Sequence, residues 1–577
     1  MVTTLASERP APPARWILPK PPDEEAVRAL AEALSLPDIV CRLLLIRGYV
    51  TAEEAKQFLR PKLDRLHDPM QFLSMDKAVS RLARAVREKE LVFIHGDYDV
   101  DGISSTTLLT RVIRWLGGEA TPFIPRRIED GYDLSDAGVD AALAAGAKVV
   151  VTCDCGTGAV APIARLCQAG VDVIVTDHHL PSGELPDCIA VLNPKRSGCG
   201  YPDKDLAAVG VTFKLAMALA HELGANENFV WAMLDLVALA TVADVAPLRG
   251  ENRVFVRYGL KMLAETRNIG MRALLRASGL DGRELTAGRI GFILAPRLNA
   301  AGRLGHAIRG VQLLLTENEH EANVIARELE ELNHRRQEID RATLEQARER
   351  VLAMNLDEQY SIVLADESWH PGVVGIVASR LVEEFGRPTV LIALSGEQGK
   401  GSGRSIPKFD LHGALGKSRE HLIRYGGHRA AAGVTIARDK VADFAARFNE
   451  VARSLLTPAD LVPEIRVDLE VSIEGLDGRI ESLFRHFEPF GIGNPTPVLL
   501  ARNVTIARPP RLVGQDGLKL VLDTGTGSLD ALGWGLATRA PELQAGTKVD
   551  IAFRLERDDY RGESYLQARI ADISVCG

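Results

Sequence analysis

Three apolar runs in the first third of the chain alternate with segments that have the spacing of helices. The runs open residues 91–102, 148–157 and 171–179, and each ends in acidic or imidazole side chains. A short apolar run with a polar end is typical of a strand that is buried on both faces of a parallel sheet. Segments such as STTLLTRVIRWLG, which lie between the runs, indicate helices. From residue 75 to about 250 the pattern therefore predicts a parallel sheet covered by helices on both faces.

The pattern changes three times in the rest of the chain. Residues 251–310 have helical spacing, and a strongly charged stretch with few helix breakers, from about 317 to 354, predicts one long helix. Residues 358–455 return to an α/β pattern that opens with the strand SIVLAD. Beyond residue 461, short alternating strands are separated by Gly and Asp turns. Such strands favour a small barrel, an OB-fold, over a generic β-domain.

These patterns predict an α/β fold class, with two α/β domains joined by a long helix and followed by a β-barrel. Residues 1 to about 20 are rich in Pro, Ala and Arg and predict either an ordered arm or a loose tail. Helical spacing follows, with Thr51 as a helix N-cap. The expected parts are 1–60 as arm and helical segment, 61–310 as the first α/β domain, 311–357 as the connecting helix, 358–457 as the second α/β domain and 458–577 as the barrel.

Composition and charge limit the class of protein. The chain has 577 residues, 46% of them hydrophobic and 25% charged, enough for several buried cores. It contains no apolar run of about eighteen residues and no apolar signal core near its start, so a cytoplasmic protein without a membrane segment is expected. Seven unevenly spaced cysteines favour reduced thiols. The net charge of −8 argues against a protein that coats nucleic acid, but residues 399–429 carry seven Lys and Arg against two acidic residues, which suits a phosphate backbone.

The polar groups at the three strand ends are all of the kinds that bind metal ions. Open α/β sheets place their sites at the carboxyl ends of the strands, so these side chains are expected at one edge. Gly96 and Gly102 indicate that the first segment curls into a loop. A further acid, Asp244, stands alone in an apolar stretch and needs a metal or a hydrogen-bond partner. The candidates are His95, Asp97, Asp99 and Asp101 on the first segment, Asp154 after the second, and Asp177, His178 and His179 at the end of the third.

Carboxylate and imidazole together suit Mn²⁺ or a similar divalent ion, and two such ions can clamp the attacking and leaving oxygens of a phosphoryl displacement. Each strand end also has a plainer interpretation, because Asp caps helices and starts turns. Their joint occurrence on successive strands favours the metal site. Cys153 and Cys155 flank Asp154, but without a second cysteine pair they are interpreted as strand and turn residues, not zinc ligands.

Taken together, these motifs resemble the DHH phosphoesterase superfamily, which is named after its Asp-His-His triplet. The resemblance rests on HGDYDVDG (95–102), Asp154, the triplet 177–179 and Asp244. GGHRAAAG (426–433) and WHPGVVGIVASRL (369–381) resemble the associated DHHA1 domain. With IPRRIEDGYDLS (124–135), APRLNAAGRLGHA (295–307) and FEPFGIGNPTPVL (487–499), the chain is similar to the RecJ family of single-strand-specific 5′→3′ exonucleases from about residue 50 to its end.

This resemblance implies a role for each candidate ligand. It implies two Mn²⁺ ions, with Mg²⁺ as the alternative, held by His95, Asp99, Asp101, Asp154, His178 and Asp244. Asp154 would bridge the ions and His179 would face the phosphate in the transition state. Asp97 and Asp177 would orient the ligands, although either His95 or Asp97 could be the primary ligand.

Further basic residues match the family's DNA-binding positions. Arg127, Ser402 and Arg404 match a pocket for the 5′-terminal phosphate, and Gly399, Gly401 and Gly403 would let backbone N–H groups approach an anion. His428 and Arg429 are implied to lie near the DNA backbone. Arg297, Asn299 and Arg303 are expected to contact phosphates, with a helical salt-bridge role as the alternative.

The implied activity is release of 5′-mononucleotides from single-stranded DNA in recombination and repair, by a monomer that works with a RecQ-type helicase and a single-strand-binding protein. Two alternatives are a phosphodiesterase of the same superfamily that acts on small molecules or nanoRNA, and a non-catalytic replication scaffold. The sequence departs from the family pattern at two places: Asp133 stands where Gly is usual, and Asp-Cys-Gly-Thr (154–157) replaces the commoner Asp-Asn-Gly-Ile.

Overall fold

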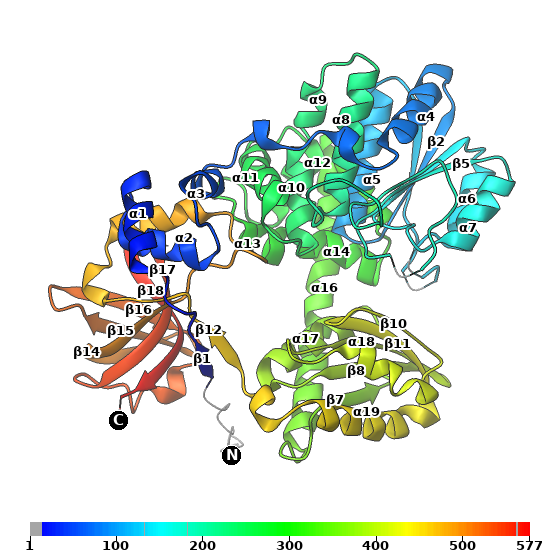
Figure 1. Cartoon of the computed structure of the whole chain (residues 1–577). Coiled ribbons are helices and arrows are strands. Elements are labelled where there is room, and N and C mark those ends of the chain that lie inside the picture. Colours follow the sequence, from blue (N-terminus) through cyan, green and yellow to red (C-terminus); the bar gives the residue numbers. More distant parts are fainter. Residues whose placement is uncertain (1–13, 128, 132, 182, 561–562, 577) are drawn as a thin grey trace.

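The computed structural model of the chain describes residues 14–576 apart from 128, 132, 182 and 561–562. Two α/β units are joined by one long helix, α16, and a β-barrel lies beside them together with the N-terminal helices (Figure 1). This arrangement confirms the predicted fold class. Among the described residues, no helix is both long and apolar enough to cross a bilayer.

The first α/β unit is built on a fully parallel sheet with the strand order β3-β2-β4-β5-β6. Its strands are β2 (Leu91–Gly96), β3 (Glu119–Phe123), β4 (Val149–Cys153), β5 (Asp172–Thr176) and β6 (Ala190–Leu192). The apolar side chains of β2, β4 and β5 divide between two separate cores. The larger core is shared with α4 (Met75–Glu88), α5 (Val100–Trp115) and α8 (Ala208–Glu222), and the smaller with α6 (Asp136–Ala144) and α7 (Val160–Gln168). Because both faces are covered, the strands are nearly continuous apolar runs.

A helical layer follows the sheet and leads to the second unit. Its elements are α9 (Asn228–Trp231), α10 (Leu234–Ala243), α11 (Gly250–Ala264), α12 (Ile269–Ala277), α13 (Ala287–Arg289), the π-helix η3 (Ile290–Leu294), α14 (Ala295–Leu304) and α15 (Ile308–Leu315). The long helix predicted from about 317 to 354 is α16 (Glu319–Leu352), and the wider connecting segment 311–357 also includes the end of α15, which stops before Thr316. The break has a local cause: the side chain of Asn318 accepts hydrogen bonds from the backbone N–H groups of His320 and Glu321 and starts a new helix. With 34 residues, α16 is about 50 Å long.

The second α/β unit contains a mixed sheet with the order β10-β11-β9-β8-β7. Its strands are β7 (Ile362–Asp366), β8 (Thr389–Ser395), β9 (Gln398–Arg404), β10 (Arg424–Gly427) and β11 (Ala431–Ala437). Its helices are α17 (Val374–Phe385), α18 (Leu411–Gly416) and α19 (Val441–Leu455). Helix α16 packs against α14 of the first unit and against α17 of the second, so this one helix contacts both units.

The C-terminal barrel closes because β14 pairs with both β15 and β17. Its strands are β14 (Leu499–Val513), β15 (Gly517–Asp523), β16 (Ser528–Gly533), β17 (Lys548–Tyr560) and β18 (Glu563–Val575). Before them, residues 464–470 form two short strands, β12 (Glu464–Arg466) and β13 (Leu469–Glu470), which pair with different partners.

The N-terminal segment belongs to the barrel side of the molecule. Strand β1 (Arg15–Ile17) pairs with β12, so the arm is ordered from this strand onward, while residues 1–13 lie outside the described part. Helices α1 (Glu24–Leu34), α2 (Asp38–Ile46) and α3 (Ala52–Leu59) share one apolar core with the barrel strands. Residues 14–60 therefore pack as a cover for the barrel and form no core of their own.

A buried arginine, Arg253, connects the first α/β unit to the N-terminal helices and to the segment that precedes the barrel. The guanidinium of Arg253, on α11, lies 4.0 Å from the ring centroid of Phe58 and donates to the backbone carbonyls of Phe58 and of residues 486–489. The partners come from α3 and from the FEPFGIGNPTPVL segment that precedes the barrel. This motif thus serves as the joint between the first α/β unit and the barrel.

Candidate active site

The acids that follow β2, β4 and β5 are brought side by side by the sheet itself. The backbone N–H of Asp97 donates to the Cys153 carbonyl at 3.2 Å, and that of Asp154 donates to the Thr176 carbonyl at 2.9 Å. The N–H of Asp177 continues the same ladder with a 3.0 Å bond to the Leu192 carbonyl. Because parallel strands end in register at the same edge, three carboxylates meet there, as the strand-end pattern predicts.

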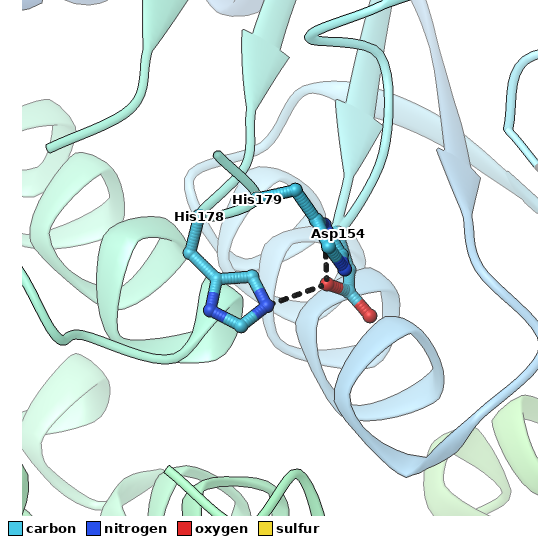
Figure 2. A group of neighbouring side chains, drawn as sticks. All are labelled: Asp154, His178 and His179. Atoms are coloured by element: carbon cyan, nitrogen blue, oxygen red, sulfur yellow. Dashed lines mark ion pairs between the residues drawn. The ribbon is translucent and has the colours of Figure 1, made fainter. Parts of the chain in front are cut away.

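Among the described residues, three groups of side chains place their ligand atoms within 4.8 Å of one another. The groups are Asp97, Asp99 and Asp154; Asp154, His178 and His179; and Asp101, His178 and Asp244. Figure 2 shows the second group, in which Asp154 Oδ1 lies 3.3 Å from His178 Nε2 and 3.8 Å from His179 Nδ1. Asp154 and His178 each belong to two groups, which is the arrangement that two neighbouring cations require.

The buried polar atoms of these groups fit bound cations. Asp97 Oδ1, Asp154 Oδ1 and His178 Nε2 are buried and have no hydrogen-bond partner among the described residues. Burial, followed by the charges of neighbouring carboxylates, raises the pKa of Asp154 far above its usual range and raises that of Asp101 to about 7. Buried carboxylates that repel one another are stable only when protonated or bound to a cation. The donor set of carboxylate and imidazole suits Mn²⁺ and also accepts Mg²⁺.

The loop after β2 turns directly into α5, which sets the positions of Asp99 and Asp101. Asp99 caps the helix, with Oδ1 accepting hydrogen bonds from the N–H groups of Asp101 and Gly102. The Asp101 carboxylate accepts 2.8 Å hydrogen bonds from the first N–H groups of α8, those of Ala208 and Val209. Gly102 was expected in a loop but lies in the first turn of α5, where a Cβ atom would approach the Asp97 carbonyl oxygen to 2.3 Å. Its role is close packing of the helix against the metal-binding loop.

Asp177 orients the two histidines that follow it. Its Oδ1 accepts hydrogen bonds from the N–H groups of His178 and His179 and lies 2.7 Å from His179 Nδ1, while Oδ2 accepts from Thr157 N–H. Burial lowers the pKa of His179, but the hydrogen bond and charge of Asp177 outweigh it and raise this pKa to about 9. His178 is different, because burial and then the charge of His179 lower its pKa to about 3. His178 is thus a neutral ligand and His179 a cationic group beside the same carboxylate.

His95 lies outside all three ligand groups. Its Nδ1 is 3.6 Å from the Cys155 sulfur, and a Cβ atom on Gly138 would approach Nε2 to 2.7 Å, so the ring is enclosed behind the sheet edge. Burial lowers its pKa to about 4. Asp97 thus lies in a ligand group with Asp99 and Asp154, whereas His95 does not, although His95 Nε2 is also buried without a hydrogen-bond partner among the described residues. The physical reason is that His95 is still within β2, whereas Asp97 is the first residue beyond it.

A pocket of guanidinium groups lies between the two α/β units. Arg404 Nη1 donates to Ser402 Oγ at 2.9 Å, and the guanidinium of Arg127 lies 4.7 Å from the ring centroid of Tyr98 in the metal-binding loop. Burial, and then the positive charges of Arg127, Arg336 and Arg404, lower the pKa of Arg303 to about 10. The charge of Arg127 also lowers the pKa of Arg404, and guanidinium groups gathered in this way favour an anion between them.

The glycines around Ser402 have a structural explanation. Gly399, Gly401 and Gly403 lie in β9, where Cβ atoms would approach Ile392, Val434 and Leu411 to 2.5, 2.6 and 3.0 Å. They are needed for packing beneath the strand, so the expected anion-binding loop is a strand. The group that approaches Ser402 from above is Gly375 in the first turn of α17, whose Cβ would lie 2.8 Å from Ser402 Oγ and 3.0 Å from Arg404 Nη2.

The other residues predicted to contact DNA differ in their surroundings. Arg297 forms an ion pair with Glu330, so the structure gives it the salt-bridge role that was the alternative. Asn299 Oδ1 accepts a hydrogen bond from Val100 N–H and so supports the metal-binding loop. His428, in the turn between β10 and β11, is close enough to His179 for the charge of that group to help lower its pKa. The guanidinium of Arg429 donates to the Pro407 carbonyl and the side chain stays exposed.

Two residues near the site were not anticipated from the sequence. Arg336 on α16 belongs to the guanidinium cluster, and Lys195 is close enough to lower the pKa values of Asp244 and His428. Lys195 follows β6, the next strand of the same parallel sheet, so the strand-end argument would have located it. Arg336 carried no such signal, because charged residues are frequent on the exposed parts of a long helix.

Both α/β units and the barrel match known protein families. The family model for the N-terminal domain of the DHH family matches residues 91–241, the DHHA1 domain matches 357–454 and the RecJ OB domain matches 467–572. The single-stranded-DNA-specific exonuclease RecJ of Bacillus subtilis is 36% identical over 97% of this chain and 71% of its own length. That of Escherichia coli is 36% identical over 93% of this chain and 96% of its own. The crystal structure of Thermus thermophilus RecJ with Mn²⁺ is 32% identical, with a TM-score of 0.84 over 97% of this chain and 79% of that one, and a second with Mg²⁺ has a TM-score of 0.78.

Proposed function

The chain belongs to the RecJ family of DHH phosphoesterases, and from this premise we propose that it is a single-stranded-DNA-specific exonuclease that releases 5′-mononucleotides from the 5′ end. One observation carries the proposal: a ligand set for two cations lies at the edge of one α/β unit, and a guanidinium pocket lies between that unit and the next. The first suits hydrolysis of a phosphodiester and the second suits an end phosphate.

The residues that would hold the metal ions are Asp97, Asp99, Asp101, Asp154, His178 and Asp244. Two divalent cations bound there supply Lewis acidity and lower the pKa of a water molecule, which phosphodiester hydrolysis needs. Asp154 is the bridging candidate because it belongs to two ligand groups. Mn²⁺ is the expected ion and Mg²⁺ the alternative.

His179 acts on the substrate through its proton. With its pKa raised to about 9, the imidazole is protonated at neutral pH, and Asp177 holds it through Nδ1. A protonated imidazole there donates a hydrogen bond to a phosphate oxygen, whose negative charge increases in the transition state. His179 thus stabilises charge, and Asp177 positions it.

The guanidinium pocket sets the polarity of cutting. Arg127, Ser402 and Arg404 would bind the 5′-terminal phosphate, since a planar guanidinium makes paired hydrogen bonds to phosphate oxygens. Arg127 stacks on Tyr98, the residue immediately before the helix-capping Asp99, so the pocket and the metal ligands share one loop. A fixed distance between them makes the first internucleotide phosphate the one that is cut.

Selection of single strands would follow from the second unit. The charge of His179 acts on His428 in the turn of the β10–β11 hairpin, which supports a position of this hairpin as a cover beside the metal ligands. A single strand fits beneath such a cover, whereas a duplex is about twice as wide. The OB-type barrel would extend the binding surface along the strand.

The wider biological setting is also part of the proposal. We infer a cytoplasmic monomer that acts in DNA recombination and repair with a RecQ-type helicase and a single-strand-binding protein; family membership is its support. A phosphodiesterase for small molecules would need neither the barrel nor the joint at Arg253. A non-catalytic scaffold would not need the complete set of ligands.

The test is degradation of a 3′-labelled, 5′-phosphorylated single-stranded DNA with Mn²⁺, run beside the Asp154→Ala variant. The expected result is a ladder that shortens from the 5′ end and is absent with the variant. No cleavage by the wild-type protein, with Mn²⁺ binding confirmed, would overturn the proposal and direct attention to small phosphodiesters.

A further inference from the structure

A second cavity lies behind the guanidinium pocket, on the side of α16. It has a volume of about 540 Å³ and is formed by η3 and α14 on one wall, α16 at the base and α17 on the other wall. Its residues come from both α/β units, and more of its surface is polar than apolar. We call this cavity the rear groove.

The rear groove is strongly cationic. Four arginines line it, namely Arg303, Arg336, Arg341 and Arg380, against one acid, Asp340. The carboxylate of Asp340 is buried between Arg380, at 2.9 Å, and Arg336, at 3.6 Å, so it neutralises one guanidinium. Three positive charges remain in a partly enclosed space, which favours a bound anion.

The rear groove lies next to the residues of the guanidinium pocket. Arg303 lines the groove, while the charges of Arg127 and Arg404, the residues assigned to the 5′-phosphate, act on its pKa. Ile376 also lines the groove and directly follows Gly375, the residue packed against Ser402 and Arg404. Arg303 and the first turn of α17 therefore face the groove on one side and the residues assigned to the 5′-phosphate on the other.

One wall of the groove also offers an aromatic face. Phe292, in the π-helix η3, lines the groove and is 88% exposed, the highest value among the large exposed hydrophobic residues of the described chain. An exposed phenyl ring beside arginines matches a ligand that has both a phosphate and a base, since bases stack on aromatic rings. π-helical turns are rare and are frequent at functional sites.

We propose that the rear groove is the exit route of the nucleoside 5′-monophosphate product, an inference that rests on the proposed function. After each cut, the product still has its 5′-phosphate in the guanidinium pocket, while the shortened strand fills the space on the metal side. The product must leave before the new 5′-phosphate can advance, and it cannot pass through the strand. The rear groove opens on the other side of the pocket, and its arginines and Phe292 would guide the nucleotide to solvent.

A bulky substitution at one exposed position that lines the groove tests the exit route. Gln337 lies on α16, is exposed and lines the groove, so Gln337→Trp narrows it, whereas Gln337→Ala is the matched open control. The substrate is a 5′-phosphorylated single-stranded DNA followed by chemical quench, so that the first cut and later cuts are timed separately. We expect the first cut of the tryptophan variant to stay within about twofold of wild type and the later cuts to slow by about fivefold or more, with the alanine variant unchanged.

A charge reversal provides an independent measurement. Arg341→Glu reverses a charge in the lining of the groove, and Arg327→Glu makes the same charge reversal on α16 outside the groove. With 2′-deoxyadenosine 5′-monophosphate as the added inhibitor, the inhibition constant should rise by about fivefold or more for Arg341→Glu only.

Three results would overturn the exit route. Unchanged later cuts in Gln337→Trp would show that product leaves elsewhere, and an equal loss of the first cut would assign the groove to substrate. Equal inhibition of both charge variants by the nucleotide would show that it does not bind in the groove. Failure of the first cut in the wild-type protein would instead refute the proposed function, and the exit route with it.

Discussion

Asp133 Oδ1 accepts a 2.7 Å hydrogen bond from the backbone N–H of Gly156. The two places where this chain departs from its family pattern are thus in direct contact. Asp133 has a left-handed backbone with φ of 76°, which Asp tolerates better than most residues. Asp154, two residues before Gly156, also has a left-handed φ of 64°, so its carboxylate depends on how this turn is held. The carboxylate of Asp133 holds the turn from one side and that of Asp177, through Thr157 N–H, from the other.

Removal of the Asp133 carboxylate should weaken Mn²⁺ binding without altering a ligand. Asp133→Gly keeps the backbone conformation available but deletes the acceptor, and we expect about tenfold weaker Mn²⁺ affinity. Asp133→Asn retains a side-chain oxygen and tolerates the same φ, so it should stay within about threefold of wild type. Titration of free Mn²⁺ by electron paramagnetic resonance measures both. Equal affinities for the glycine and asparagine variants would contradict a role for this hydrogen bond.

Asp97 and His95 should differ as metal ligands. Asp97 belongs to a ligand group with Asp99 and Asp154, whereas His95 is enclosed beside Cys155. We expect Asp97→Asn to lower Mn²⁺ affinity by at least about tenfold and His95→Gln by less than about threefold. The same titration applies, with the melting temperature of each metal-free variant as the control for folding. The reverse order would restore His95 as the primary ligand.

Stabilisation by Mn²⁺ should increase with pH. Burial and neighbouring carboxylates raise the pKa of Asp101 to about 7 and raise those of Asp154 and Asp244 strongly. A carboxyl group whose pKa is higher in the folded state holds its proton there, so the metal-free protein loses stability as pH rises from about 4 through the folded pKa. Mn²⁺ must displace these protons, and it replaces the charge compensation that they provided. The rise in melting temperature on adding Mn²⁺ should therefore be larger at about pH 8 than at about pH 6. An equal rise at both would argue against protonated carboxyl groups in the metal-free site.

Arg404 should control the preference for a 5′-phosphate. Arg404→Ala removes a guanidinium that contacts Ser402 Oγ, and we expect the ratio of kcat/KM for 5′-phosphorylated over 5′-hydroxyl DNA to fall by about tenfold or more. Arg438→Ala, a half-buried arginine that pairs with Glu367 after β11, is the control. A proportional loss on both substrates would place Arg404 on the DNA backbone instead of the end phosphate.

Loss of Arg253 should loosen the barrel from the first α/β unit. Its guanidinium donates to five backbone carbonyls from two other parts of the chain, and truncation removes all of these hydrogen bonds. We expect Arg253→Ala to lower the free energy of unfolding by about 2 kcal/mol or more and to raise hydrogen exchange in residues 485–498. Lys261→Ala on the same helix is the exposed control. Unchanged exchange in 485–498 would mean that the joint does not depend on Arg253.

The strand ends and the overall order of the parts could be predicted because they depend on local pattern. Apolar runs that end in Asp or His marked β2, β4 and β5, and the parallel pairing then brought Asp97, Asp154 and Asp177 into one row. The same argument does not specify where a side chain points once the chain leaves the strand. The choice between His95 and Asp97 depended on the turn into α5, which is stabilised by the contact of Gly102 with the Asp97 backbone.

The amino-acid sequence by itself determined the α/β class, the long helix, the barrel and the chemical nature of the metal ligands, because periodicity and residue type act over a few neighbouring residues. Only the tertiary structure decided that Arg297 pairs with Glu330, that Arg303 and Arg336 join Arg127 and Arg404, and that the N-terminal helices cover the barrel. These are contacts between segments far apart in the chain. Their partners are chosen by packing and by the need to compensate buried charge, and neither leaves a periodic trace in the sequence.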